Sequence, residues 1–204
     1  MILIYHFNYL IYFMINFLYS IDVSIFYFIN HSIANPIFDN FFIFITDVKN
    51  WYLVYIILWF ICFFKGGRKG KIAAILSLFL ITISDQFSSF FVKNLVERIR
   101  PCNALPDVRA ITGCTGSYSF PSSHAVNNFA AAFFFYKVFP NLKWILFIVA
   151  SLIAFSRVYV GKHYPSDVLG GAIIGSAIGY LFAFTALKID QYFINKSQNL
   201  NKEN

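Results

Sequence analysis

Five long apolar segments, separated by short polar connections, constrain the fold of this chain more than any other feature. They run over residues 51–64, 72–92, 125–138, 144–155 and 168–187. A helix needs roughly 20 residues of this character to cross a bilayer. Only 12% of the residues are charged, whereas a soluble domain carries about 25%. The sequence therefore predicts an integral membrane protein made of helices.

The first 46 residues hold further apolar sequence, in which residues 3–19 are the best candidate for another crossing. Asn35-Pro36 and Asp39 interrupt the stretch 21–45, which suits a segment lying at the membrane surface. We therefore expect an all-α integral membrane bundle of about six transmembrane helices with an additional interfacial N-terminal helix.

The same pattern divides the chain into three parts. They are N-terminal membrane and interfacial helices at 1–50, a transmembrane core at 51–194, and a polar cytoplasmic tail at 195–204.

The net charge of +7 fits the topology of a membrane protein better than a nucleic acid partner. Its basic residues fall between apolar runs and not along one solvated face, which argues against a nucleic acid partner. If the crossings alternate, the basic regions at 65–71, 137–143 and 188–202 share one side, which the positive-inside rule assigns to the cytoplasm. The count is nine basic residues inside against seven outside.

Three polar clusters fall at the outer ends of the predicted spans. They are Lys93-x6-Arg100-Pro101, Pro121-Ser122-Ser123-His124 and Ser156-Arg157-x5-His163-x3-Asp167. Three cations, two imidazoles and a carboxylate that converge on one pocket could bind and cleave a phosphate.

His163 and Asp167 would share one face of a helix. The carboxylate could fix the tautomer of the ring and leave its other nitrogen free as a nucleophile. Taken alone, the pair also fits an interfacial histidine followed by an acid that the helix dipole favours.

Ser122 and Ser123 are favoured residues for the start of the helix at 125–138. A helix N-terminus directs N–H groups at an anion, and His124 could donate a proton to a leaving oxygen. Ordinary capping beside a spectator histidine is the alternative. Lys93, Arg100 and Arg157 could form a phosphate cradle, although each alone also fits a membrane-surface anchor.

Other residues have structural interpretations. Asp85 lies within a span and is expected to make a polar contact inside the bundle, and Gly171, Gly175 and Gly179 favour close helix packing. Cys102 and Cys114 bracket an outer loop, where a disulfide would stabilise the fold by about 3 kcal/mol; two free thiols are equally compatible. No Cys/His spacing resembles a zinc site.

Together, the three clusters resemble the motifs of the type 2 phosphatidic acid phosphatase superfamily. Those motifs are Lys-x6-Arg-Pro, Pro-Ser-Gly-His and Ser-Arg-x5-His-x3-Asp. The first and third match at every defining position, whereas Ser123 stands where the family usually has glycine.

The resemblance implies a six-helix membrane enzyme that needs no metal or other cofactor, with 51–194 as its catalytic phosphatase core. His163 would attack phosphorus and become phosphorylated, Asp167 would orient it, and His124 would protonate the leaving group. The implied phosphate cradle consists of Lys93, Arg100, Arg157, Ser122 and Ser123.

The expected substrate is a phospholipid or polyprenyl phosphate in the outer leaflet, with undecaprenyl pyrophosphate as first choice. Lipid A 1-phosphate and phosphatidylglycerophosphate or phosphatidate are the alternatives. No obligate protein partner is expected. The resemblance suggests a multi-pass protein of the bacterial inner membrane whose active site faces the periplasm or cell exterior. A non-catalytic lipid-binding or transport protein is a second class, but transporters usually place polar groups near the bilayer midplane.

Overall fold

The computed structural model describes residues 2–203, with side chains described for residues 9–201, and this part of the chain is helical and has no strand. The long helices are α1 (Ile2–Tyr27), α3 (Tyr52–Lys65), α4 (Gly67–Gln86), α7 (Ser123–Val138), α8 (Lys143–Tyr159) and α9 (Pro165–Glu203). Short helices are α2 (Pro36–Thr46), α5 (Lys93–Val96) and α6 (Pro101–Ala104). Single turns connect them at η1 (Phe28–Ser32), η2 (Val48–Trp51), η3 (Phe87–Val92) and η4 (Pro140–Leu142).

Within the described residues, five helical segments are long and apolar enough to cross a membrane. They are Tyr9–Ser32, Val48–Lys65, Gly67–Ala104, Pro140–Tyr159 and Pro165–Asn201. The sixth expected crossing, at 125–138, corresponds to α7, which has 16 residues and is not among the five. It packs against α4, α8 and α9, so its neighbours cover it. The predicted all-α membrane bundle is confirmed.

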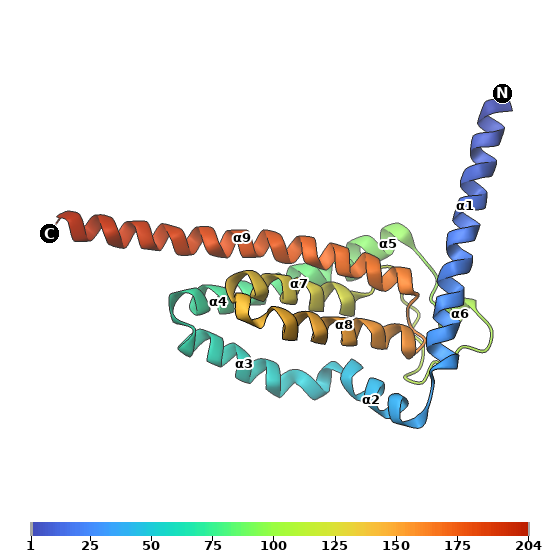
Figure 1. Ribbon diagram of the computed structural model, residues 1–204, viewed down its shortest axis with the longest axis horizontal. Coiled ribbons are helices and arrows are strands. Elements are labelled where there is room, and N and C mark those ends of the chain that lie inside the picture. The colour runs from blue at the N-terminus through green and yellow to red at the C-terminus, as the bar shows by residue number, and fades with distance from the viewer. Residues whose placement is uncertain (1, 204) are drawn as a thin grey trace.

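The N-terminal region differs in detail from the expectation. The candidate crossing at 3–19 and the beginning of the stretch 21–45 form one helix, α1, which runs across the end of the bundle in Figure 1. Asn35-Pro36 starts α2 because the Asn35 side chain accepts a hydrogen bond from the Phe38 N–H and Pro36 occupies the first turn. α2 packs along α8. The first part of the stretch 21–45 thus belongs to the candidate span Tyr9–Ser32, and its second part forms the separate short apolar helix α2.

Close contact between α7 and α9 depends on the predicted glycine strip. A Cβ atom on Gly175 would lie 2.2 Å from the Val126 carbonyl oxygen, and one on Gly179 would lie 2.3 Å from that of Ala130. Small residues therefore let the two backbones approach.

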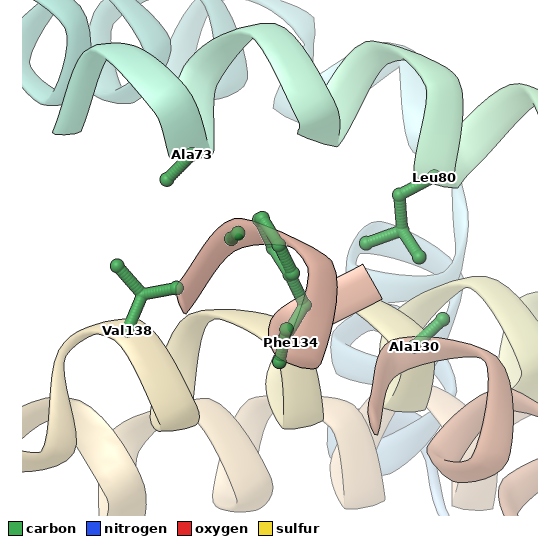
Figure 2. Close-up of a cluster of buried hydrophobic side chains, with 7 residues drawn as sticks. Ala73, Leu80, Ala130, Phe134 and Val138 are labelled. Atoms are coloured by element: carbon green, nitrogen blue, oxygen red, sulfur yellow. The ribbon is translucent and has the colours of Figure 1, made fainter. Parts of the chain in front are cut away.

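On the side that faces α4, α7 packs through a cluster of buried hydrophobic side chains. Figure 2 shows Ala73 and Leu80 of α4 facing Ala130, Phe134 and Val138 of α7.

Three further expectations can be compared with the structure. Asp85 accepts a hydrogen bond from Asn127 Nδ2 at 3.0 Å, a polar contact between α4 and α7. Cys102 and Cys114 form a disulfide, with Cα atoms 6.1 Å apart. The polar C-terminal segment continues α9 as a helix to Glu203.

Candidate phosphate-binding and catalytic site

A cavity of about 250 Å³ lies where α7 and α9 begin and α8 ends. Its lining residues are Lys93, Arg100, Thr115, Ser117, Ser123, His124, Arg157, Lys162 and His163. Six of the eight residues singled out in the sequence therefore line one cavity. The other two, Ser122 and Asp167, adjoin it: the Ser122 N–H donates to the Asp167 carbonyl oxygen at 3.1 Å, and Asp167 lies beside His163.

The turn between α8 and α9 places His163. The backbone N–H groups of Lys162 and His163 both donate to the Arg157 carbonyl oxygen, at 3.1 and 3.2 Å. Gly161 has φ of 82°, a conformation that glycine adopts without strain. A Cβ atom there would also lie 2.8 Å from the Arg109 carbonyl oxygen. The turn is therefore specified by a glycine and brings His163 back to the last turn of α8.

The partners of the His163 ring define its tautomer. Nδ1 lies 2.8 Å from the Ser119 carbonyl oxygen, which can only accept a hydrogen bond. Nε2 lies 3.0 Å from Arg100 Nη1, which can only donate. Neutral His163 therefore carries its proton on Nδ1 and has its lone pair on Nε2. Because His163 lines the cavity, this is the nitrogen available to attack a bound phosphate.

The protonation state of His163 follows from its surroundings. Burial, together with the nearby charges of Arg157, Arg100 and Lys93, holds the pKa of His163 well below its ordinary value. The ring is therefore neutral near pH 7 and keeps its nucleophilic lone pair.

Asp167 makes its shortest contact with a residue that the sequence did not single out. Its Oδ1 lies 2.6 Å from Arg98 Nη1, while its Oδ2 accepts a hydrogen bond from the Tyr164 N–H at 2.9 Å. Oδ2 is 3.6 Å from His163 Nδ1. Asp167 thus stands beside the ring, but the Ser119 carbonyl oxygen is the closer partner of Nδ1.

Three cations of the site are buried. Lys93, Arg100 and Arg157 are each at most 7% exposed. Arg100 donates from Nε to the Ser117 carbonyl oxygen at 2.7 Å and from Nη2 to Ser117 Oγ at 3.0 Å. Ser117 thereby fixes the plane of the guanidinium group.

Arg157 and Lys162 have fewer polar partners. Arg157 Nη1 donates to Thr46 Oγ1 at 2.5 Å, whereas its buried Nε has no hydrogen-bond partner among the described residues. Burial, with Arg157 and Arg100 close by, lowers the pKa of Lys162. Within the described residues, no carboxylate forms an ion pair with Lys93, Arg100, Arg157 or Lys162. The cavity therefore favours an anion strongly.

The start of α7 places His124 and the two serines. Ser122 occupies the N-cap position, as expected, but its side chain makes no capping hydrogen bond, and its buried Oγ has no partner among the described residues. Ser123 Oγ lies 2.9 Å from Ser89 Oγ of η3. The serines therefore begin the helix without using their hydroxyl groups as caps.

Sequence reasoning missed several residues of the site. Arg98 and Lys162 stand next to recognised motifs, so their positive charge was a usable signal. Thr115 and Ser117 follow the disulfide-closed loop, and the sequence gives no sign that they face a cavity. Asp22 and Thr46 reach the site from distant parts of the chain and carry no motif, whereas Ser119 stands two residues before Pro121 and acts through its carbonyl oxygen, which its residue type does not reveal.

This arrangement suits phosphoryl transfer. His163, whose Nε2 is unprotonated and paired with Arg100, lines a cavity in which several cations can stabilise the charge of a phosphoryl group in transfer, and a second imidazole lines the same cavity. Among the described residues, no group of three or more His, Cys, Asp or Glu side chains could hold a metal ion.

Comparisons with known proteins agree with this geometry. The family model of the PAP2 superfamily, the type 2 phosphatidic acid phosphatases, matches residues 74–189. The lipid A 4'-phosphatase of Bacteroides thetaiotaomicron is 35% identical over 185 residues, which cover 86% of this chain and 81% of that protein. An undecaprenyl-diphosphatase of Sulfolobus acidocaldarius is 33% identical over 119 residues, which cover 58% of this chain and 56% of that protein.

A solved structure has a similar fold. The crystal structure of a transmembrane PAP2-type phosphatidylglycerolphosphate phosphatase from Bacillus subtilis gives a TM-score of 0.62 at 27% identity. The match covers 87% of this chain and 88% of that one.

The lowered pKa of His163 can be measured by NMR on protein with isotope-labelled histidine. We expect the His163 ring to remain neutral, with its proton on Nδ1, as the pH falls through about 6.5, where an ordinary histidine becomes charged. The unfolded protein provides the reference titration. A folded-state midpoint at or above that of the unfolded chain would contradict the assignment.

Proposed function

The chain belongs to the PAP2 superfamily and is a membrane lipid phosphatase that hydrolyses phosphate esters, and from this premise we propose that it acts through a phosphohistidine formed on His163. The observation that carries the proposal is the unprotonated Nε2 of His163, which accepts a hydrogen bond from Arg100 beside cations that have no carboxylate partner among the described residues. When a phosphate enters, its oxygens compete for the Arg100 guanidinium, and this releases the lone pair of Nε2 for attack.

Two chemical steps complete the reaction. In the first, His163 Nε2 forms a bond to phosphorus while the bond to the leaving oxygen breaks, and His124 gives that oxygen a proton. In the second, water attacks phosphorus, the P–N bond breaks, and the proton of the water returns to His124. The products are the lipid alcohol, or the lipid monophosphate from a diphosphate, and inorganic phosphate.

The cavity cations take the role that a metal ion has in many other phosphatases. Lys93, Arg100 and Arg157 hold the phosphate oxygens and stabilise their charge in the transition state, with the start of α7 at Ser122 and Ser123 as an additional anion-binding element. Accordingly, we propose a reaction that requires no metal ion.

We propose that the site faces the outer leaflet. The cavity lies at one end of the bundle, where a phosphate head group can enter while its acyl or prenyl tail stays in the bilayer. The distribution of basic residues, nine against seven, supports this orientation, with the opposite end in the cytoplasm. In a bacterial inner membrane, the site would then open to the periplasm or cell exterior.

The substrate we favour is a phosphorylated lipid A, because the similarity to a lipid A 4'-phosphatase covers 86% of the chain. Undecaprenyl diphosphate, the first choice from the sequence alone, is the second candidate. Lys162 favours it, since this cation lines the cavity and could hold the second phosphate of a diphosphate.

His163→Ala should abolish phosphate release from lipid substrates, with a loss of at least about 10³-fold in kcat. Wild-type protein assayed with EDTA and radiolabelled lipid phosphate should yield an acid-labile, alkali-stable phosphoprotein that this variant lacks. His31→Ala provides the matched control, because His31 is exposed and lies outside the cavity. Near wild-type activity of His163→Ala would refute the nucleophile assignment, and loss of activity in EDTA that a divalent ion restores would refute the metal-free mechanism.

Lys162→Gln tests whether Lys162 binds the second phosphate of a diphosphate substrate. Phosphate release is compared on undecaprenyl diphosphate, undecaprenyl monophosphate and phosphorylated lipid A. If Lys162 binds a second phosphate, kcat/KM should fall about tenfold more for the diphosphate than for the monophosphate, as expected for one charge-assisted hydrogen bond. Lys143→Gln at the far end of α8 is the control. Equal losses on both prenyl substrates would exclude the diphosphate role.

A further inference from the structure

Arg98 joins two carboxylates behind the catalytic histidine. Its Nη1 lies 2.6 Å from Asp167 Oδ1, and its Nη2 lies 2.6 Å from Asp22 Oδ2. The Asp167 side chain is fully buried and that of Asp22 is 9% exposed. A planar guanidinium that bridges two buried carboxylates fixes both in position.

Asp22 brings α1 into this network. Its Oδ1 accepts a hydrogen bond from the Ser166 N–H at 2.8 Å, and its Oδ2 accepts one from Ser166 Oγ at 2.5 Å. Ser166 lies in the first turn of α9, one residue before Asp167. Figure 1 shows α1 crossing the bundle beside the beginning of α9. A single side chain of α1 therefore binds both the start of α9 and the arginine that holds Asp167.

The net charge of Asp22, Arg98 and Asp167 bears on the charge of the His163 ring. Asp22 and Asp167 each contribute one negative charge and Arg98 contributes one positive charge, so the group carries a net charge of −1 beside the His163 ring. Without Asp22, Arg98 would neutralise Asp167 and the group would be uncharged. Attack on phosphorus gives the ring a positive charge, which a net negative group stabilises and a neutral group does not.

We propose that Asp22 and Arg98 are positioning residues of the phosphatase reaction, which act on His163 through Asp167. Arg98 pairs with Asp167 Oδ1, the Tyr164 N–H keeps Oδ2 beside the ring whether or not Arg98 is present, and Asp22 preserves the negative charge of Asp167 by balancing Arg98. The N-terminal helix is thereby part of the catalytic apparatus. This inference rests on the proposed role of His163 as nucleophile.

Other charged or titratable groups also face His163. The positive groups near its ring come from α5, from the residue before α6 and from α8, and His124 comes from α7. These groups are Lys93, Arg100, Arg157 and His124. All of them either repel or fail to stabilise a positively charged ring. Asp167, backed by Asp22, is the negative group that opposes them.

The test compares kcat and KM of purified full-length Asp22→Asn and of the double variant Asp22→Asn/Arg98→Gln with wild type. Asp22→Asn makes the group neutral, so kcat should fall about tenfold, as for other partners that orient a catalytic ligand. KM should stay within about twofold, because the cavity cations are untouched. The double variant restores the net charge of −1, and its kcat should exceed that of Asp22→Asn by about threefold or more.

A purely structural role predicts a different order. Each lost ion pair would then reduce the folded fraction, so the double variant would be no more active than Asp22→Asn. That result, or an unchanged kcat for Asp22→Asn, would overturn the proposal. Thermal unfolding of every variant in detergent separates loss of folding from loss of turnover.

Asp39→Asn is the matched control. It removes the ion pair between Asp39 Oδ2 and Arg109 Nη2, which has a similar length of 2.7 Å and does not involve Asp167. Its kcat should remain near that of wild type. Full activity of His163→Ala would instead refute the proposed function itself, so the two failures are distinguishable.

Discussion

Mutual repulsion among the cations of one cavity is the constraint on which the site depends. Lys93, Arg100 and Arg157 are buried together, Lys162 joins them at the lining, and among the described residues no carboxylate pairs with any of them. Burying unpaired charge is costly, so the rest of the fold must hold these side chains in place. The oxygens of a bound phosphate would offset this repulsion.

Helix packing and hydrogen bonds together hold the buried cations and His163 in place. The glycines of α9 bring its backbone against α7, which places Asp167 and His163 beside the first turn of α7. Hydrogen bonds from polar partners then fix individual side chains. Ser117 fixes Arg100, Thr46 holds Arg157, and the network of Asp22 and Arg98 holds Asp167. Rigid helices and polar contacts together give a preorganised site.

Much of this could be predicted from the sequence because local patterns carry it. Apolar segments gave the membrane bundle, and the spacing of Lys93, Arg100, His124, Arg157 and His163 gave residues that meet in one cavity. The course of α1 was not predictable, since its direction depends on an ion pair between residues 76 positions apart. The same holds for the contact between Arg157 and Thr46, which are 111 positions apart.

Two other features show where local reasoning reaches its limit. Ser122 has the residue type of a helix cap, yet its hydroxyl makes no capping bond, because a preference for a position does not decide which hydrogen bonds form. His163 and Asp167 have the expected spacing of four residues, yet the Ser119 carbonyl oxygen is the nearer partner of the ring. Only the folded chain brings Ser119 to that position.

The most direct test of the central claim is a structure of the wild-type protein with orthovanadate bound. Vanadate adopts the five-coordinate geometry of phosphorus in transfer. Our account predicts vanadium bonded to His163 Nε2, its oxygens in contact with Lys93, Arg100 and Arg157, and the Arg100 guanidinium withdrawn from Nε2. Vanadate bound elsewhere, or held in the cavity with His163 Nε2 still turned to Arg100, would contradict it.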